Sequence, residues 1–169
     1  MTTVIERPAP RDNQVLIRPA QASDADALRR MYRRCGADSR YARFHGVLNE
    51  MPSTYLDSVL GADPHAHDAL VAETAGGDLV ALGSAARMPT EGPPVVEIGL
   101  LVEDRWQQRG IGSSLLGVLA ARARRRGMER LRCDVLAGNR HLLAMLRRHT
   151  ATLAICYEGG VAMVEADLR

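Results

Sequence analysis

The chain has 169 residues, of which 46% are hydrophobic and 25% are charged, with a formal net charge of +2. This length favours one domain, whose core needs no metal or disulfide to hold it. Three widely spaced cysteines exclude a disulfide scaffold and indicate a reducing compartment. The longest apolar run, residues 115–121, is far shorter than the ~18 residues of a membrane span. The first 14 residues lack the pattern of a signal peptide, so we expect a cytoplasmic protein.

All 22 basic side chains are arginines, so this chain carries no side-chain amine of its own. A codon bias explains this without any functional cause. The charge is also uneven along the chain. Residues 1–100 carry 10 Arg and 13 acidic residues, whereas residues 101–169 carry 12 Arg and 7 acidic residues. The positive field of the second part suits an anionic partner, either a phosphate-bearing small molecule or a nucleic acid.

The first half of the chain predicts a strand, two helical regions and a hairpin. Residues 1–14 are a polar, proline-containing tail, and residues 15–18 form a short strand that ends at Pro19. Ser23 is in position to cap a helix that ends at Gly36. A second helical region covers residues 39 to about 60, with an interruption near Pro52. Two short apolar runs, 70–73 and 79–82, flank a glycine-rich turn that is typical of a hairpin.

The second half predicts alternating strands and helices. Residues 95–102 are almost wholly apolar, which favours a central strand buried on both faces. The segments that follow are a helix, a strand, a helix and a closing hairpin, over residues 110–126, 130–136, 139–148, 152–158 and 161–168. With no repeat and no linker, this order predicts one three-layer α/β (α+β) domain over residues 15–169, built on a mixed sheet of about seven strands.

The strongest local signal for function is the segment Gln107-Gln108-Arg109-Gly110-Ile111-Gly112-Ser113, between the apolar strand and the long helix. Its glycines let a ligand approach the backbone, and the helix start offers unpaired N–H groups and the positive end of its dipole. These features suit a pyrophosphate, although the glycines alone are more typical of a tight turn. The segment is not a Rossmann fingerprint, which needs a small residue at position 115, nor a P-loop, which needs a lysine.

In its context, this segment resembles the acetyl-CoA signature of the GNAT N-acetyltransferases, a Gln/Arg-x-x-Gly-x-Gly/Ala motif that follows a strand. Residues 102–106 extend the likeness, and residues 134–139 resemble the family's second cofactor segment, with Asn139 at a helix start. The order of elements matches over residues 15–168. Residues 39–44 resemble the Ser-x-Tyr-x-Arg-Phe stretch of Pat-type bacterial protein lysine acetyltransferases, which helps to form the wall on the acceptor side.

The resemblance implies the GNAT fold, with a mostly antiparallel sheet, acetyl-CoA as co-substrate and no metal. A monomer and a homodimer both stay open. The resemblance also implies that backbone of the apolar strand and the glycine-containing segment bind the cofactor, through Leu100, Leu101, Val102, Gln107, Gln108, Arg109, Gly110, Ile111, Gly112 and Ser113. Asn139 is expected to touch the pantetheine arm. Apart from the resemblance, Tyr41 and Phe44 lie three residues apart, which favours two core aromatics on one helix face.

Glu97 is the candidate general base. It interrupts an otherwise apolar strand, and a buried carboxylate is costly unless it is paired or functional. Amine acetylation needs a neutral nitrogen, whereas an alkylammonium has a pKa of about 10.4. A carboxylate can accept that proton directly or through water. The resemblance agrees, because Pat-type proteins place their catalytic glutamate on this strand. A position on an edge strand, or a pairing with an arginine, would explain Glu97 without catalysis.

Gly99, two residues after Glu97, predicts a β-bulge. In GNAT proteins a bulge here separates two parallel strands, and the pantetheine arm hydrogen-bonds between them. The resemblance then implies that a backbone N–H near Leu100 or Leu101 polarises the thioester carbonyl, and we assign this catalytic role to Leu101.

The chain departs from the family in two places. Many GNAT enzymes have a tyrosine seven residues after the asparagine, where it protonates the leaving thiolate, and here that position is Leu146. The usual Gly-Phe after this helix is replaced by residues 150–151, which affects the acceptor end of the pocket. Tyr157 lies too late in the chain to replace the tyrosine, and we expect it in the core of the hairpin.

Three further features have structural explanations. Residues 63–68 contain two His and two Asp but no third anchored His, so we expect no metal site. The arginines at 122 and 124–126 end a helix, where they complement its dipole, and one of them could bind the 3′-phosphate of CoA. Cys133 falls on a buried strand, which argues against an acyl-cysteine.

We therefore expect an acetyl-CoA-dependent N-acetyltransferase that acts on a primary amine in a ternary complex. Pat-type features favour a protein lysine, supplied in trans. Two alternatives stay open on this fold: an acetyltransferase for a small-molecule amine, and a non-catalytic acyl-CoA-binding regulatory module. A nucleic-acid binder is disfavoured, because few aromatic residues accompany the basic run. We expect no membrane partner, and no cyclic-nucleotide domain of the kind joined to some Pat-type domains.

Overall fold

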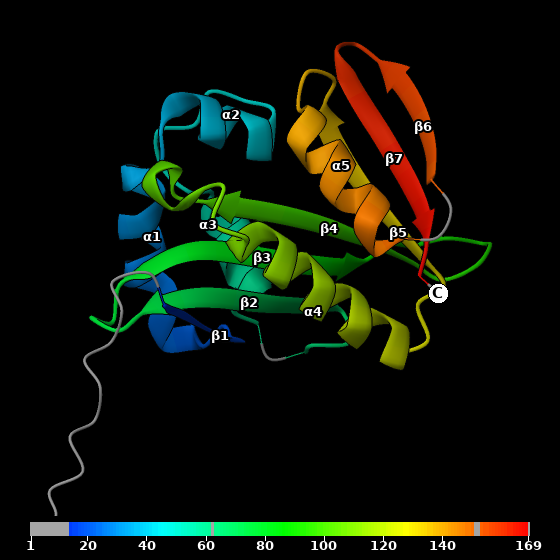
Figure 1. Cartoon of the computed structure of the whole chain (residues 1–169). Helices are drawn as coiled ribbons and strands as arrows, with labels where there is room; N and C mark the ends of the chain where they lie inside the picture. Colours follow the sequence, from blue (N-terminus) through cyan, green and yellow to red (C-terminus); the bar gives the residue numbers. More distant parts are fainter. Residues whose placement is uncertain (1–13, 62, 151–152, 169) are drawn as a thin grey trace, which may run out of the picture.

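The computed structural model describes residues 14–61, 63–150 and 153–168. They form one seven-stranded sheet of order β1-β2-β3-β4-β5-β7-β6, with helices on both faces (Figure 1). Neighbouring strands are antiparallel except for β4 and β5, which are parallel. The predicted α/β fold with a mixed, mostly antiparallel sheet is confirmed. The predicted tail, apart from its last residue, lies outside the described residues.

Helices α1, α2 and α3 of the first half cover one face of the sheet. The elements of this half are β1 (Val15–Pro19), η1 (Ala22–Asp24), α1 (Ala25–Arg34), α2 (Ala37–Phe44), α3 (Ser53–Val59), β2 (His67–Thr74) and β3 (Leu79–Arg87). The prediction that Ser23 caps α1 is wrong, because it lies within the 3₁₀ turn η1. Asp24 is the N-cap residue of α1, but its side chain makes no cap hydrogen bond to that helix. Its carboxylate accepts from the Gln21 N–H in the capping box of η1 and from Arg18, whose hydrogen bond holds the pKa of the Asp24 carboxyl below its usual range.

Helices α4 and α5 of the second half cover the opposite face. The elements are β4 (Val95–Val102), η2 (Asp104–Trp106), α4 (Ile111–Arg125), β5 (Arg130–Leu136), α5 (Arg140–His149), β6 (Leu153–Glu158) and β7 (Val161–Asp167). These bounds agree with the predicted ones to within one residue at each end. No helix in the described part of the chain is long and apolar enough to cross a membrane.

The sheet separates two hydrophobic cores. The larger lies between the sheet and helices α4 and α5, and it contains Leu115 and Leu146. The smaller lies between the sheet and helices α1 and α3, and it contains Met31. Strand β4 contributes to both, since Ile98 belongs to the larger core and Leu101 to the smaller. Alternate side chains of β4 are therefore covered by different helices.

Two of the three aromatic predictions are wrong. Phe44 packs against the smaller core as expected, but Tyr41 is 44% exposed on the outer side of α2. Tyr157 is 61% exposed, because β6 is the edge strand of the sheet. The two exposed rings show that aromatic character alone did not place these positions in a core.

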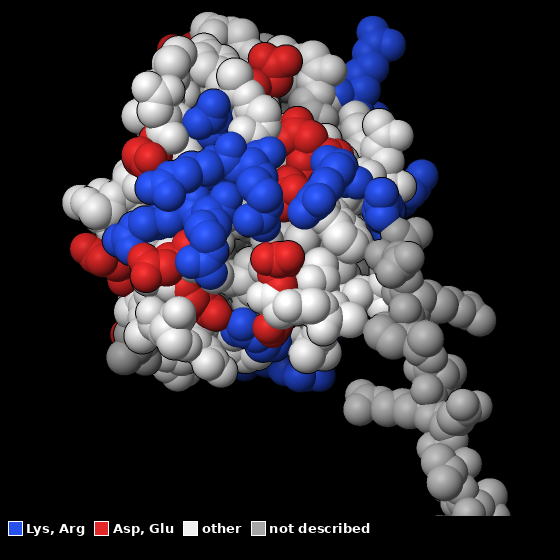
Figure 2. Space-filling view, turned by 90° about the vertical axis from the view of Figure 1, so that its left-hand side faces the viewer, with Lys and Arg blue, Asp and Glu red and all other residues white. Residues whose placement is uncertain are grey.

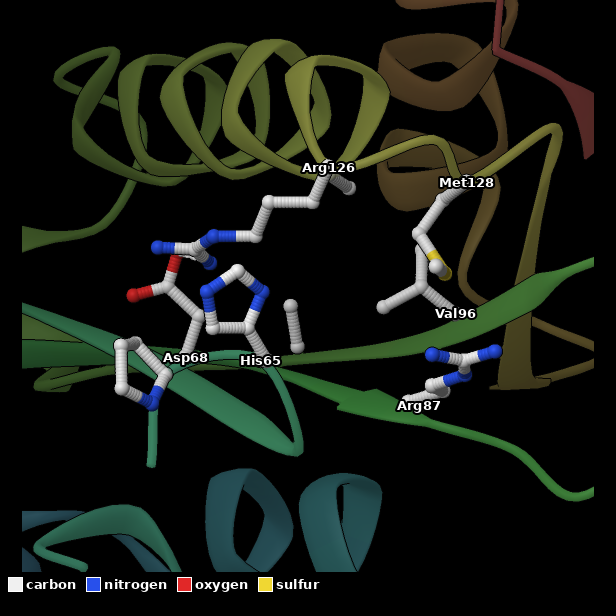
Figure 3. Close-up of a pocket in the computed structure, with 9 residues that line it drawn as sticks. His65, Asp68, Arg87, Val96, Arg126 and Met128 are labelled. Atoms are coloured by element: carbon white, nitrogen blue, oxygen red, sulfur yellow. Dashed lines mark hydrogen bonds and ion pairs between the residues drawn. The ribbon is translucent and has the colours of Figure 1, made fainter. Parts of the chain in front are cut away.

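An ion-pair cluster joins β2 to the end of α4. The buried Asp68 carboxylate accepts hydrogen bonds from Arg122 Nε at 2.7 Å and from Arg126 Nη1. Figure 3 shows Asp68 and Arg126 together at a pocket of about 20 Å³, which holds roughly one water molecule and is too small for a substrate. No three His, Cys, Asp or Glu side chains of the described residues gather to hold a metal ion.

We expect Asp68→Asn to lower the free energy of unfolding by about 2 kcal/mol, because hydrogen bonds to charged groups are lost at two arginines. Chemical denaturation at neutral pH measures this change. Asp63→Asn is the matched control: Asp63 lies in the loop just before β2 and is exposed, so its change should stay below about 0.5 kcal/mol. Equal stability of the two variants would contradict the role of the cluster.

Candidate active site

Strands β4 and β5 are parallel, but they pair at three positions only. Residues 95–97 lie opposite residues 130–132, whereas β4 continues to Val102 and β5 to Leu136 without further pairing between them. A pocket of about 230 Å³ lies where the two strands part. Its lining comes from four elements: residues 42–45 at the end of α2, residues 97–100 of β4, Cys133 and Asp134 of β5, and Leu142 of α5.

The backbone of β4 is divided between its two neighbours. In an antiparallel pair, only alternate residues exchange hydrogen bonds with the partner strand. The N–H of Glu103 donates to the carbonyl of Val80, and the register of β3 and β4 is unbroken from there along the strand. The N–H groups of Leu100 and Val102 therefore face the gap toward β5, whereas the N–H of Leu101 faces β3. The donor nearest Glu97 within the gap is thus that of Leu100.

The bulge predicted at Gly99 is absent. Gly99 lies opposite Ser84 in the unbroken register, so the parting of β4 from β5 needs no extra residue in β4. The missing side chain has another consequence. A Cβ at this position would overlap the guanidinium of Arg43, which rests directly on the strand. Glycine therefore makes room for an arginine from α2.

Arg43 is held in place by two rings and two hydroxyls. Its Cζ lies 4.9 Å from the ring centroid of Phe44 and 4.8 Å from that of Tyr55. Its Nη2 donates hydrogen bonds to Tyr55 Oη at 2.9 Å and to Ser84 Oγ at 3.3 Å. The guanidinium is consequently a fixed part of the pocket wall beside Gly99. The motif of residues 39–44 drew attention to this stretch, but it did not show that Arg43 reaches β4.

Glu97 lines the pocket, but the burial predicted for it is wrong. Its side chain is exposed, and its carboxylate makes no hydrogen bond or ion pair with any residue that the structure describes. The reason is that this side chain points into the pocket between α2 and the parted strands, and into neither core. The carboxylate is therefore open to water and to an incoming amine.

The predicted pyrophosphate segment forms the turn from η2 into α4. Gln108 and Gly110 have positive φ angles of 58° and 82°, and Gly110 is the N-cap of α4. Because the N–H of Ser114 donates to the carbonyl of Gly110, the N–H groups of residues 111–113 have no partner within the helix. A Cβ on Gly110 would meet no atom within 4 Å, so the space outside the turn is open.

A hydrogen-bond network ties this turn to the start of α2. Gln107 Nε2 donates to Ser39 Oγ at 2.9 Å and to the Val102 carbonyl at 3.0 Å. Asp104 accepts from the Gly36 N–H at 2.7 Å and from Ser39 Oγ at 3.0 Å. Sequence reasoning missed this network, because its partners are 65 and 68 residues apart and leave no local pattern.

Helix α5 closes the pocket from the other side. Asn139 is its N-cap, and its Oδ1 accepts a hydrogen bond from the N–H of Leu142 at 3.1 Å. Leu146 is buried in the larger core, so the position of the family tyrosine contributes no proton donor. At the end of the helix, His149 Nε2 lies 2.8 Å from Ser113 Oγ, which joins α5 to the first turn of α4.

The arginines of the α4 end lie far from the phosphate turn. At 1.5 Å per residue, residues 122–126 are about 20 Å from the start of the helix. This distance argues against the prediction that one of them binds the 3′-phosphate of CoA.

Basic side chains gather elsewhere too, on the face that carries α1 (Figure 2). Three arginines of α1 form ion pairs with acidic residues: Arg29 with Asp26, Arg33 with Glu50 and Arg34 with Glu103.

Cys133 is a buried pocket residue whose thiol is unreactive at neutral pH. Burial raises the pKa of Cys133 to about 12, and burial does the same for Cys35. At pH 8 both thiols stay protonated, since thiolate forms only as the pH approaches those values. We expect iodoacetamide at pH 8 to alkylate the exposed Cys156 and to spare the other two, as read by peptide mass spectrometry. Similar labelling rates for Cys133 and Cys156 would contradict this, and the unfolded chain is the control.

The mixed sheet with two parted parallel strands, and helices on both faces, agrees with the GNAT fold. Residues 26–150 match the model of the acetyltransferase (GNAT) family, and the chain belongs to this family. It is a GNAT-type acyltransferase, and the family binds acetyl-CoA.

Several solved structures are similar over most of the chain. The GNAT domain of S. lividans PAT has 29% identity and a TM-score of 0.81, covering 90% of each chain. The cAMP-binding acyltransferase from Mycobacterium smegmatis has 25% identity and a TM-score of 0.62, covering 92% of this chain and 44% of its own. The acetyltransferase yncA from Salmonella typhimurium, solved with its cofactor acetyl-CoA, has 18% identity and a TM-score of 0.71 over 92% and 95% of the chains. This last likeness shows the fold alone.

Proposed function

We propose that this chain transfers an acetyl group from acetyl-CoA to the side-chain amine of a protein lysine, with Glu97 as the general base. The observation that carries the proposal is the open Glu97 carboxylate in the pocket where β4 parts from β5. A second exposed carboxylate, Asp134, lines the same pocket and adds to the attraction for a lysine ammonium. The similarity to the GNAT domain of S. lividans PAT agrees with the Pat-type resemblance of residues 39–44, from which the protein substrate is inferred.

The chain's own backbone supplies the cofactor contacts in this proposal. The turn of residues 107–113 binds the pyrophosphate, and Asn139 offers its amide nitrogen toward the pantetheine arm. The gap-facing N–H of Leu100 donates to the thioester carbonyl, a role that the sequence assigned to Leu101. Because this donor is fixed by the sheet, it needs no reorganisation as charge develops on the oxygen.

Glu97 accepts a proton from the lysine ammonium, directly or through a water molecule. The neutral amine then attacks the thioester carbon, the new C–N bond forms, and the C–S bond breaks. Helix α5 offers no acid for the thiolate, because Leu146 is buried and Leu142 is the α5 residue that lines the pocket. The proton for the thiolate of CoA therefore comes from outside α5, from water or from another group.

The test measures thiol release from acetyl-CoA with dialysed cell protein as acceptor, together with acetyl-lysine by mass spectrometry. The chain has no lysine, so every acetyl-lysine found comes from the acceptor. The matched control uses the same dialysed cell protein after reductive methylation of its lysines. We expect release that depends on free lysines. Release with small amines, but with neither protein arm, would contradict the protein substrate.

A further inference from the structure

We propose that the same pocket accepts acyl donors that end in a carboxylate, such as malonyl-CoA and succinyl-CoA, and that Arg43 binds this carboxylate. The inference rests on the proposed function, because it takes the thioester to lie at the N–H of Leu100. The bonds made and broken are those of acetyl transfer: the C–N bond forms, the C–S bond breaks, and the proton goes to Glu97. The product is an amide that carries the terminal carboxylate.

Arg43 is a half-buried cation without a carboxylate partner among the described residues. Three other partly buried arginines pair with an acidic side chain: Arg18 with Asp24, Arg34 with Glu103, and Arg122 with Asp68. Arg40 is the exception, since its guanidinium donates, within the described structure, only to the Asn49 carbonyl. Arg43 binds two hydroxyls instead. A partly buried charge without a counter-charge is unfavourable, so a ligand with a carboxylate is favoured beside the Arg43 guanidinium.

The guanidinium has donors to spare, and it is held in a fixed orientation. Of its five N–H donors, only those on Nη2 have partners, Tyr55 and Ser84, so Nε and Nη1 are available. The rings of Phe44 and Tyr55 restrain its plane on β4. An arginine restrained in this way loses little conformational freedom on binding a carboxylate, and the charge-assisted bonds it forms are strong.

The position of Arg43 is at the acyl end of the gap. Its guanidinium rests on Gly99, and the next residue along the strand, Leu100, turns its N–H toward β5. A thioester carbonyl bound to that N–H places the acyl chain beside the guanidinium. An acetyl group ends before it reaches the cation, whereas a dicarboxylic acyl chain extends its charge toward it.

Two other charged groups face the pocket, Glu97 from β4 and Asp134 from β5, and neither forms an ion pair with Arg43. Glu97 is exposed and binds the ammonium of the acceptor, whereas Arg43 binds the carboxylate of the acyl donor. The negative and positive groups of the pocket therefore contact different substrates. His67, beside Tyr55, does not compete for the carboxylate, since burial lowers the pKa of its imidazole and favours the neutral form.

The test compares succinyl-CoA with butyryl-CoA, which has the same number of acyl carbons and no charge. Calorimetry without acceptor gives the dissociation constants for the wild type, Arg43→Met and Arg43→Lys. We expect the wild type to prefer succinyl-CoA by about ten-fold, the ratio for one good charge-assisted contact. Arg43→Met should bring the ratio close to one, and Arg43→Lys should keep part of it.

Equal affinities of the wild type for the two donors would overturn the inference, and this comparison needs no variant to fold. A preference for succinyl-CoA that survives in Arg43→Met would overturn it as well. If Arg43→Met raises KM only for acceptor amines that carry a carboxylate, the partner charge belongs to the acceptor and the inference fails. A succinyl preference in binding without transfer of any acyl group to amines would support the inference and count against the proposed function alone.

Discussion

Glu97→Gln is expected to lower kcat at pH 7 by about 10²–10⁴-fold, the usual contribution of a general base. Glutamine keeps the size and polarity of the side chain but cannot accept the proton of the lysine ammonium. The open position of Glu97, with no partner in the described structure, means that the substitution breaks no existing hydrogen bond or ion pair. The loss of rate should therefore occur without loss of stability.

The pH dependence distinguishes a missing base from a damaged pocket. Without Glu97, the reaction relies on the fraction of neutral amine, which rises with pH and reaches one half at about 10.4. The deficit of Glu97→Gln should therefore shrink as the pH increases. Glu97→Asp and Asp134→Asn are the controls, since the first keeps a carboxylate and the second removes the other one in the pocket. A greater loss in Asp134→Asn than in Glu97→Gln would assign the base to Asp134.

Gly99→Ala is expected to lower the free energy of unfolding by about 2 kcal/mol, because the displaced Arg43 loses two hydrogen bonds that contribute about 1 kcal/mol each. The new Cβ would take the place of the Arg43 guanidinium and drive it away from Tyr55 and Ser84. In an Arg43→Ala background this space is empty, so the same substitution should be tolerated. A double-mutant cycle should show a coupling of at least about 1 kcal/mol.

The matched control for this cycle is Gly138→Ala. A Cβ there would meet no atom within 4 Å, and Gly138 has no positive φ, so its effect should stay below about 0.5 kcal/mol. Urea denaturation of the four cycle members and the control gives all values. Additive effects of Gly99→Ala and Arg43→Ala would contradict the close approach of the guanidinium to the strand.

Local patterns were sufficient for most of the fold. The apolar run of β4 and the periodic leucines of α4 lie within single elements, and their predicted bounds agree with the structure. Ser23 was misjudged because the 3₁₀ turn η1 precedes α1 and contains Ser23, a turn that the Asp24 carboxylate stabilises by accepting from the Gln21 N–H.

The candidate site was harder to predict, since it depends on distances between elements. An apolar strand predicts burial for every residue in it, but Glu97 points to a face that no helix covers completely. The role of Gly99 depends on Arg43, which is more than fifty residues earlier in the chain. The alternation that turns the Leu100 N–H toward the gap follows from the register with β3, which no single segment encodes.

The N–H groups of β4 alternate between β3 and the gap, and this affects how such a domain evolves. In the proposed mechanism, the group that stabilises the developing charge belongs to the main chain, and every residue type except proline retains it. The side chains of α2 and β5 around the pocket can then be replaced without removing that group. Preference for a donor or an acceptor can drift by point substitution, while the ability to transfer an acyl group is inherited with the sheet itself.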